Sequence, residues 1–142
     1  MNKKMNAKSY FVTIDFGTAT TINVVKAPGT FIGGVIAPGI QVMYDSLNSR
    51  TSQLPSINTS DYKTIVGNDT NSAIASGVIH STIGLINQMY NHLNNLDDCE
   101  DVRFFITGGM ANQVKNFLEV DFIYDEFLVL KGVRAVHKLN SQ

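Results

Sequence analysis

The stretch that most constrains the fold is residues 10–21, which read YFVTIDFGTATT. An apolar run carries one acid, Asp15, near its end and continues directly into a segment of glycine and threonines. The apolar residues fall on both faces of an extended chain, which predicts a central strand buried on both sides. A carboxylate at the end of such a strand is costly to bury unless a cation, a proton or several donors meet it. The stretch therefore predicts a strand that ends in a binding site.

The residues after Asp15 have two interpretations. Gly17 lets the backbone approach a ligand closely, and the hydroxyls of Thr18, Thr20 and Thr21 would offer donors to a phosphate-sized anion. Alternatively, Asp-Phe-Gly forms a hairpin turn, and the threonines occupy strand positions that suit their β-branching.

Composition narrows the class of protein. The chain has 142 residues and a formal net charge of −1, a size at which one domain can bury a usable core. It has neither a basic excess nor a cluster of Lys and Arg, which argues against nucleic acid as the main partner. Since we find neither a membrane-spanning apolar run nor a signal-peptide core, we expect a cytoplasmic protein without a membrane partner.

Cysteine and histidine offer little chemistry. Cys99 is the only cysteine, so an intrachain disulfide is impossible. His80, His92 and His137 are scattered along the chain, which disfavours a zinc site or a catalytic triad.

Two more strands are predicted after the glycine-threonine segment. We expect residues 1–9 to be a mobile lead-in, residues 21–26 to return as an antiparallel strand, and residues 31–37 to form a third strand. Gly33 and Gly34 interrupt this third strand, which indicates either a bulge or the close approach of a ligand. Pro38 and Gly39 are then expected to open a helix, and residues 51–63 to form a loop that could act as a lid.

A long helix is predicted from residue 71 to residue 94. Asn68, Asp69 and Thr70 precede it and are all suitable N-caps, so free N–H groups there could meet an anion or a carbonyl. The helix carries an apolar stripe and a second row of small residues, which predicts that both faces are covered, one by the sheet and the other by a second chain. We expect His80 to pack in the core or an interface rather than to act as a base.

The last third of the chain predicts a β-α unit and a short tail. An acidic loop at 94–101 is expected to be a solvated surface. A strand at 102–107 then leads through Gly108 and Gly109 into a helix over 110–119, a turn that would present bare backbone to a ligand. A strand and a last helix follow. This order, three hairpin-connected strands followed by helices and a β-α unit, resembles one α/β domain of the actin, hexokinase and heat-shock ATPase superfamily, in which two such domains usually face each other across a nucleotide cleft.

Several blocks in consistent order carry a more specific resemblance. They are DFGTATT at 15–21, FIGGVIAPGI at 31–40, SLNSRTSQLP at 46–55, VGNDTNSAIASG at 66–77, ITGG at 106–109 and LVLKGV at 128–133. Together they resemble the carboxy-terminal half of a type III pantothenate kinase, a family also called Bvg accessory factor-like. The resemblance assigns residues 10–142 to one carboxy-terminal-type domain.

The resemblance implies roles for particular residues. Asp15 would help to bind a monovalent cation, potassium or ammonium, beside the nucleotide, and Gly17 and Thr18 would contact ATP, with magnesium as a further cofactor. Gly108 and Gly109 would line the adenosine side. Thr70 would contact pantothenate, and the glycine pair at 33–34 would belong to the substrate side.

The sequence also departs from the family pattern. The usual chain is about twice as long and opens with a DxGNT phosphate loop, followed by a GxDR segment whose Asp is taken as the base. Neither pattern occurs here, so no catalytic residue is expected in this chain. Two hypotheses follow: the chain is one subunit of a split, oligomeric kinase whose partner carries both motifs and makes 4'-phosphopantothenate for coenzyme A biosynthesis, or it is an inactive nucleotide-binding or regulatory module.

Overall fold

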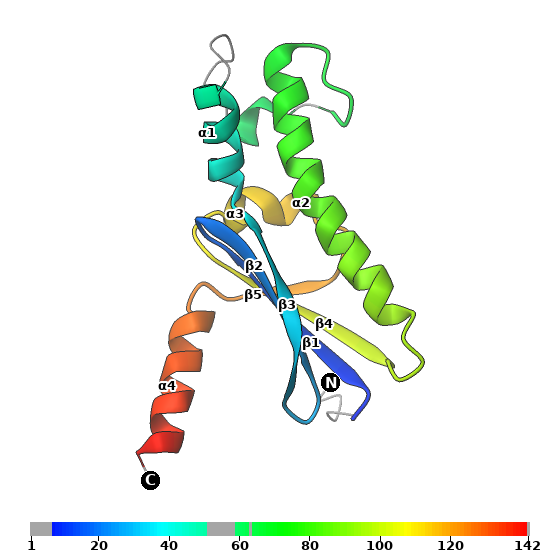
Figure 1. The fold of residues 1–142 in the computed structure, drawn as a ribbon, viewed down its shortest axis with the longest axis vertical. Helices are drawn as coiled ribbons and strands as arrows, with labels where there is room; N and C mark the ends of the chain where they lie inside the picture. The colour runs from blue at the N-terminus through cyan, green and yellow to red at the C-terminus, as the bar shows by residue number, and fades with distance from the viewer. Residues whose placement is uncertain (1–6, 51–58, 63, 142) are drawn as a thin grey trace.

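A five-stranded mixed sheet forms the centre of the molecule in the computed structural model, which describes residues 7–50, 59–62 and 64–141. The strand order is β3-β2-β1-β4-β5, in which β1, β2 and β3 are antiparallel and β4 and β5 run parallel to β1. The strands are β1 (Ser9–Phe16), β2 (Ala19–Lys26), β3 (Thr30–Pro38), β4 (Asp101–Thr107) and β5 (Phe122–Tyr124). Figure 1 shows β1 in the middle of the sheet. The predicted three-stranded antiparallel start is confirmed.

The alternation along β1 explains which face of the sheet is buried. Tyr10, Val12, Ile14 and Phe16 point to one face and are at most 4% exposed. The residues between them, including Phe11 and Asp15, are only partly buried. The prediction of burial on both faces is therefore wrong within this chain, because the described helices pack against one face only.

Helices α1 (Ile40–Arg50) and α2 (Thr70–Asn94) lie together in the upper part of Figure 1, and α2 continues along the buried face of the sheet. Asp69 is the N-cap of α2: its side chain accepts a hydrogen bond from the Ser72 backbone N–H at 2.8 Å, and the Ser72 hydroxyl lies 3.2 Å from the Asp69 backbone nitrogen. This reciprocal capping box satisfies two donors that a helix start leaves free.

Helix α2 buries one apolar stripe, but its small residues remain exposed. Ile79 and Ile86 are fully buried, and Ile86 belongs to the core cluster that contains the buried residues of β1 and β4. Ala73, Gly77, Ser81 and Gly84 are exposed, and of the small row only Ser76 is buried, where its hydroxyl donates to the Ile65 carbonyl at 2.5 Å. The expected second covering surface is not supplied by the described part of this chain.

The segment after β4 differs from its prediction. Helix α3 (Ala111–Val114) is a single turn that continues into the short 3-10 helix η2 (Lys115–Phe117). Ala111 and Val114 are its only buried positions. A helix over 110–119 was expected, but its polar residues give too few core contacts to support one. After β5, helix α4 (Leu128–Asn140) projects away from the sheet (Figure 1).

Several expected boundaries shift by a few residues. β1 begins at Ser9, the last residue of the expected lead-in; residues 1–6 lie outside the described part. Pro38 ends β3 instead of opening a helix, and α1 begins at Ile40. Of the expected lid loop, residues 59–61 form the 3-10 helix η1 (Thr59–Asp61), while 51–58 and 63 lie outside the described residues.

Candidate functional site

A polar pocket of about 370 Å³ opens at one edge of the sheet, where β1, β4 and β5 end together. Its lining residues are Asp15, Thr107, Gly108, Gly109, Asn112, Tyr124, Glu126 and Val129. The parallel pairing of β4 with β1 and β5 brings these strand ends to the same edge. Ligands of open α/β sheets bind outside the carboxyl ends of parallel strands, so this edge is the expected location for a site.

Asp15 and Gly108 pack against each other at the base of this pocket. Gly108 has φ +100°, and a Cβ added there would lie 2.5 Å from Asp15 Oδ1 and 2.5 Å from the Phe16 nitrogen. Only glycine fits both the backbone conformation and the space. The turn after β4 therefore lies directly against the acid of β1.

The β1–β2 hairpin turn flanks the pocket. Gly17 and Thr18 form the turn, in which the Gly17 N–H donates to the Ala19 carbonyl at 3.2 Å. Gly39 packs on this turn: its N–H donates to the Thr18 carbonyl at 2.9 Å, and a Cβ there would lie 2.3 Å from the Gly17 oxygen. Thr18 is exposed. The hairpin-turn interpretation of this stretch is confirmed, and Asp15 is its one residue in the pocket lining; the phosphate-site interpretation stays a prediction.

The other two threonines of the stretch belong to β2. Thr20 is 1% exposed, and its hydroxyl has no hydrogen-bond partner among the described residues. Thr21 pairs with Asp15 across the sheet. A buried Thr20 hydroxyl on the α2 face is not available to an anion in the Asp15 pocket.

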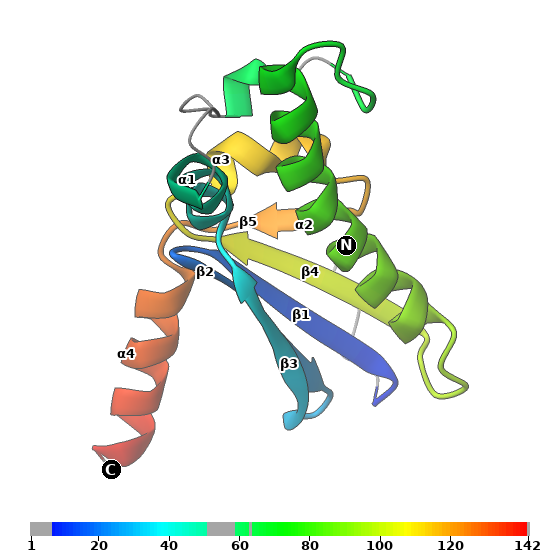
Figure 2. The same cartoon turned by 45° about the horizontal axis from the view of Figure 1, so that its top comes forward.

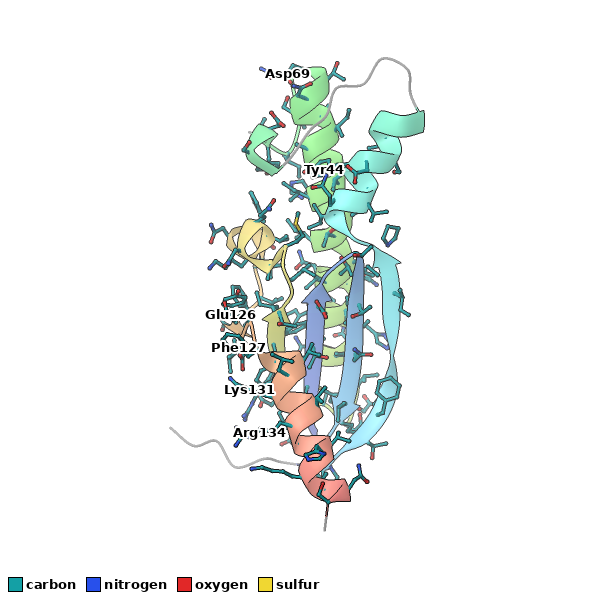
Figure 3. All side chains as sticks on the ribbon, turned by 90° about the vertical axis from the view of Figure 1, so that its left-hand side faces the viewer. Tyr44, Asp69, Glu126, Phe127, Lys131 and Arg134 are labelled. Carbon is teal, nitrogen blue, oxygen red and sulfur yellow. The ribbon has the colours of Figure 1, made fainter. Side chains whose placement is uncertain are left out.

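The predicted substrate residues lie away from the Asp15 pocket. Gly33 and Gly34 are on β3, next to an irregularity in the β2–β3 register, and they line a separate pocket of about 230 Å³ with Tyr10 and His92. The bulge, one of the two alternatives predicted for this glycine pair, is present in the β2–β3 pairing. Thr70 is exposed at the start of α2; its neighbour Asp69 is labelled at the upper end of the molecule in Figure 3, well away from Glu126 near the middle.

Sequence reasoning missed Glu126, Tyr124, Asn112 and Thr107 as pocket residues. Glu126 adds a second carboxylate to the lining, and the Thr107 hydroxyl donates to the Glu126 carbonyl at 3.4 Å. These residues lie at the ends of β4 and β5 or shortly after them, and only the parallel pairing of β1, β4 and β5 brings them to Asp15. The available signal was that residues after two parallel strands meet at one edge of the sheet.

Asp125 fixes the chain between the pocket and α4. Its N–H donates to the Ile106 carbonyl at 3.0 Å, its carboxylate accepts from the Phe127 N–H at 3.0 Å, and Lys131 Nζ lies 2.5 Å from its Oδ2. The hydrogen bond from Lys131 lowers the pKa of Asp125. The start of α4 is thereby tied to the strand end that carries the pocket.

The predicted acidic loop is only partly a solvated surface. Asp98 accepts a hydrogen bond from Tyr10 at 2.9 Å and pairs with Lys26, so it fastens the loop to β1 and β2. Lys26 holds the pKa of Asp98 below its ordinary value, with Tyr10 as the second cause. His80 is half-buried, with Nε2 3.2 Å from the Tyr62 hydroxyl, so it packs in the fold as predicted.

Comparisons with known proteins place this chain in a family. Residues 2–92 match the family model "Type III pantothenate kinase". Curated relatives of that name come from Streptomyces coelicolor, 35% identical over 91% of this chain and 49% of its own length, and from Agathobacter rectalis, 34% identical over 92% and 50%. The relative from Thermosipho africanus is 36% identical over 86% of this chain and 49% of its own.

Solved structures agree on the fold. A structure described as a conserved putative Baf family transcriptional activator from Campylobacter jejuni has a TM-score of 0.59 at 24% identity, covering 92% of this chain and 58% of the other. A non-polymerisable quadruple mutant of pCBH ParM has a TM-score of 0.51 at 15% identity, covering 87% and 45%. The molecule is a single α/β domain of the actin-like ATPase fold.

The chain belongs to the type III pantothenate kinase family. It spans about half the length of the curated relatives that it matches. None of its described helices is long and apolar enough to cross a membrane.

Proposed function

We propose that this chain is one subunit of a split type III pantothenate kinase, corresponding to the carboxy-terminal half of the family and completed by a partner with the DxGNT and GxDR motifs. The pocket of Asp15, Gly108, Gly109 and Glu126 carries the proposal, because it lies open at a sheet edge and holds two carboxylates. Family membership and the half-length match support it. The family match falls on residues 2–92, so the assignment to the carboxy-terminal half rests on the two missing motifs and the order of the quoted blocks.

The pocket suits part of a nucleotide. A volume of about 370 Å³ is at the small end of the range for ligand pockets, which fits one wall of a site that a second body closes. ATP would supply the transferred phosphoryl group. The glycines at 108–109 allow its adenosine side to approach the backbone, and the turn at Gly17 and Thr18 lies beside the phosphates.

Asp15 would hold a monovalent cation, potassium or ammonium, next to the phosphates. Its carboxylate oxygen is a hard ligand of the kind that such cations and magnesium accept. Among the described residues no three His, Cys, Asp or Glu side chains gather into a metal cluster, so the remaining ligands would come from backbone oxygens, nucleotide and water. The chain's contribution to phosphoryl transfer is thus to position the nucleotide and to offset its charge.

Pantothenate would be bound by groups beyond this one domain. Thr70 begins the end of α2 that extends beyond the sheet, and its neighbour Asp69 lies well away from Glu126 of the Asp15 pocket, so one small substrate would not span Thr70 and that pocket in the same chain (Figure 3). If Thr70 contacts pantothenate, it does so for the site of another chain in an oligomer. The proton acceptor for the substrate hydroxyl would come from the partner's GxDR aspartate.

The decisive experiment uses the chain purified from its native cell, with its copurifying proteins identified. Phosphorylation of pantothenate is assayed with the chain alone, with the candidate partner alone, and with both. Activity confined to the mixture supports the split kinase. An inactive mixture, or no copurifying protein that carries both motifs, contradicts it.

The alternative is an inactive nucleotide-binding module, which the missing base motif favours. Calorimetry with a non-hydrolysable ATP analogue in potassium buffer tests the binding that both functions share. Asp15→Asn should weaken this binding about tenfold or more, as expected for loss of a charged ligand group. Asp97→Asn, an exposed carboxylate in the loop before β4, is the matched control and should bind as the unchanged protein does. Binding with no activity in any mixture would leave the module as the function.

A further inference from the structure

Helix α4 carries an apolar stripe that nothing in the described part of the chain covers. Among residues 128–140, all of which the structure describes, no side chain is buried. We define the apolar stripe of α4 as five side chains between 55% and 76% exposed: Val129, Leu130, Val133, Val136 and Leu139. Spacing of this kind gives a helix one continuous apolar side, which folded proteins normally bury.

The opposite side of α4 is basic. Lys131, Arg134 and Lys138 follow one another at helical spacing, and His137 borders the stripe. The helix contains no acidic residue. Lys131 is paired with Asp125, and Arg134 lies about one turn further along the exposed helix (Figure 3). Lys138 follows about one turn after Arg134 in the sequence of the helix.

The face of the sheet opposite α2 is uncovered as well. Figures 1 and 2 show α2 and α4 on opposite sides of the sheet, so the uncovered face lies on the α4 side. Ile36 on β3 and Ile123 on β5 are 80% and 55% exposed, and the alternation of their strands directs them to this face. Two apolar surfaces on the same side of one domain call for a covering body larger than a short peptide.

We propose that α4 is a docking arm whose apolar stripe binds the complementary half of the fold, carried by a separate polypeptide with an acidic rim. This proposal rests on the proposed function, because it identifies the surface through which the partner of the split kinase is held. The curated relatives have about as much chain outside the match as within it, which supplies a body of the required size.

The stripe is continuous with the candidate site. Val129 lines the Asp15 pocket and also begins the stripe, and Asp125 ties the start of the helix to β4. A body seated on the stripe therefore reaches the mouth of the pocket. Docking on α4 would close the open side of the site as well as hold the two subunits together.

The missing motifs distinguish this occupant from a second copy of the chain. Two α4 helices packed stripe to stripe would turn both basic sides outward, but a second copy would not supply the DxGNT and GxDR motifs that the proposed function requires. A partner with acidic residues around an apolar groove would cover the stripe and meet the basic side only at its margins.

The test is site-specific photo-crosslinking of the full chain in its native cell, with p-benzoylphenylalanine placed at position 133 in the stripe or at position 138 on the basic side. We expect position 133 to give one discrete adduct with a protein that carries the DxGNT and GxDR motifs, and position 138 to give little or none. An adduct with a second copy of the chain, an adduct with lipid, no adduct, or equal adducts from both positions would each overturn the proposal.

Affinity measurements with that purified partner complete the test. Val133→Asp should weaken binding at least about 30-fold, as loss of a central interface anchor does, whereas Lys138→Ser should change it about fivefold or less. Thermal unfolding of both variants should match the unchanged chain, since neither side chain is buried. An active pair without a position-133 adduct would refute the docking arm and leave the kinase function standing. A position-133 adduct with a partner that gives no activity would support the docking arm and refute the kinase function.

Discussion

Helices α2 and α4 have similar apolar periodicity but opposite surroundings. α2 buries nine residues, among them Ile79, Ile83 and Ile86, and its start is closed by the Asp69–Ser72 capping box. α4 buries none of its thirteen residues, and no side chain caps its start at Phe127. An apolar stripe in a sequence therefore predicts a helix and a covered face, but it does not say which chain covers it.

The difference divides the molecule into a folded core and a projecting surface. The α2 side of the sheet holds the buried side chains of β1 and β4, so it determines the stability of the domain. The α4 side carries exposed apolar groups that do little for the isolated chain. Substitutions on the two sides should accordingly separate stability from association.

Ile86→Ala on α2 should have the largest effect on stability. Ile86 is 0% exposed, so the truncation leaves a cavity and should lower the free energy of unfolding by about 2–5 kcal/mol. Chemical denaturation measures this loss. Leu130→Ala on α4 removes a similar volume at a 65% exposed position and is the matched control. Equal losses in the two variants would contradict the division into core and projecting surface.

Gly108→Ala should lower the free energy of unfolding less than Ile86→Ala does, and it should also damage the Asp15 pocket. The new Cβ would meet Asp15 and the backbone of Phe16 at a positive φ, which predicts a loss of about 1–3 kcal/mol. Nucleotide-analogue binding should fall more than stability alone explains. Gly29→Ala, in the turn between β2 and β3, is the control, because nothing lies within 4 Å of a Cβ there and the residue is outside the pocket lining. Unchanged binding by the Gly108 variant would disprove the close packing at the pocket base.

Asp69→Ala tests the capping that α2 has and α4 lacks. Loss of the side-chain acceptor for the Ser72 N–H should lower stability by about 1 kcal/mol. Urea denaturation measures the change, and Asp69→Asn, which keeps an acceptor, should restore most of it. A variant with alanine as stable as the unchanged protein would mean that the cap contributes nothing.

The sheet and the long helix could be predicted because their signals are local. The hairpin-connected strands β1, β2 and β3 alternate in sequence, and α2 combines a strong cap with a regular apolar stripe. The helix predicted over 110–119 is too long because its polar sequence resembles the surface of a helix. Only Ala111 and Val114 of α3 are buried.

Half of the pocket could be predicted and half could not. Asp15 and Gly108 are visible as a strand end and a strand-to-turn glycine in the sequence. Glu126 and Tyr124 join them only through the pairing of β5 with β4, a contact between segments whose spacing has no local signal. Thr70 was predicted as a site residue from its position at the helix start and from the family resemblance, and the position at a helix start carries no information about the distance to Asp15.

Asp98 should give a pH-dependent contribution on the α2 side. Its folded pKa is lowered by Lys26 and Tyr10, so its contribution is present above the ordinary carboxyl pKa of about 4 and is lost as the pH falls through the folded value. Asp98→Asn should therefore lower stability at pH 7 and make little difference at pH 2. Denaturant titrations at both pH values measure this. A stability loss of equal size at both pH values would rule out ion pairing as the cause of the Asp98→Asn effect. Asp97→Asn is the control and should not change the stability.

Val133→Ser should have the smallest effect on the isolated chain and therefore sharpens the comparison most. Val133 is 62% exposed on α4, and a substitution at such a surface position changes stability by about 0.5 kcal/mol or less. Val78→Ser on α2, where the valine is 4% exposed, should cost several times more because it places a hydroxyl in the core. Denaturation of both variants at low protein concentration measures the pair. If Val133→Ser proved as damaging as Val78→Ser, α4 would be packed in the isolated chain, and its stripe would belong to the core of this domain instead of to a partner.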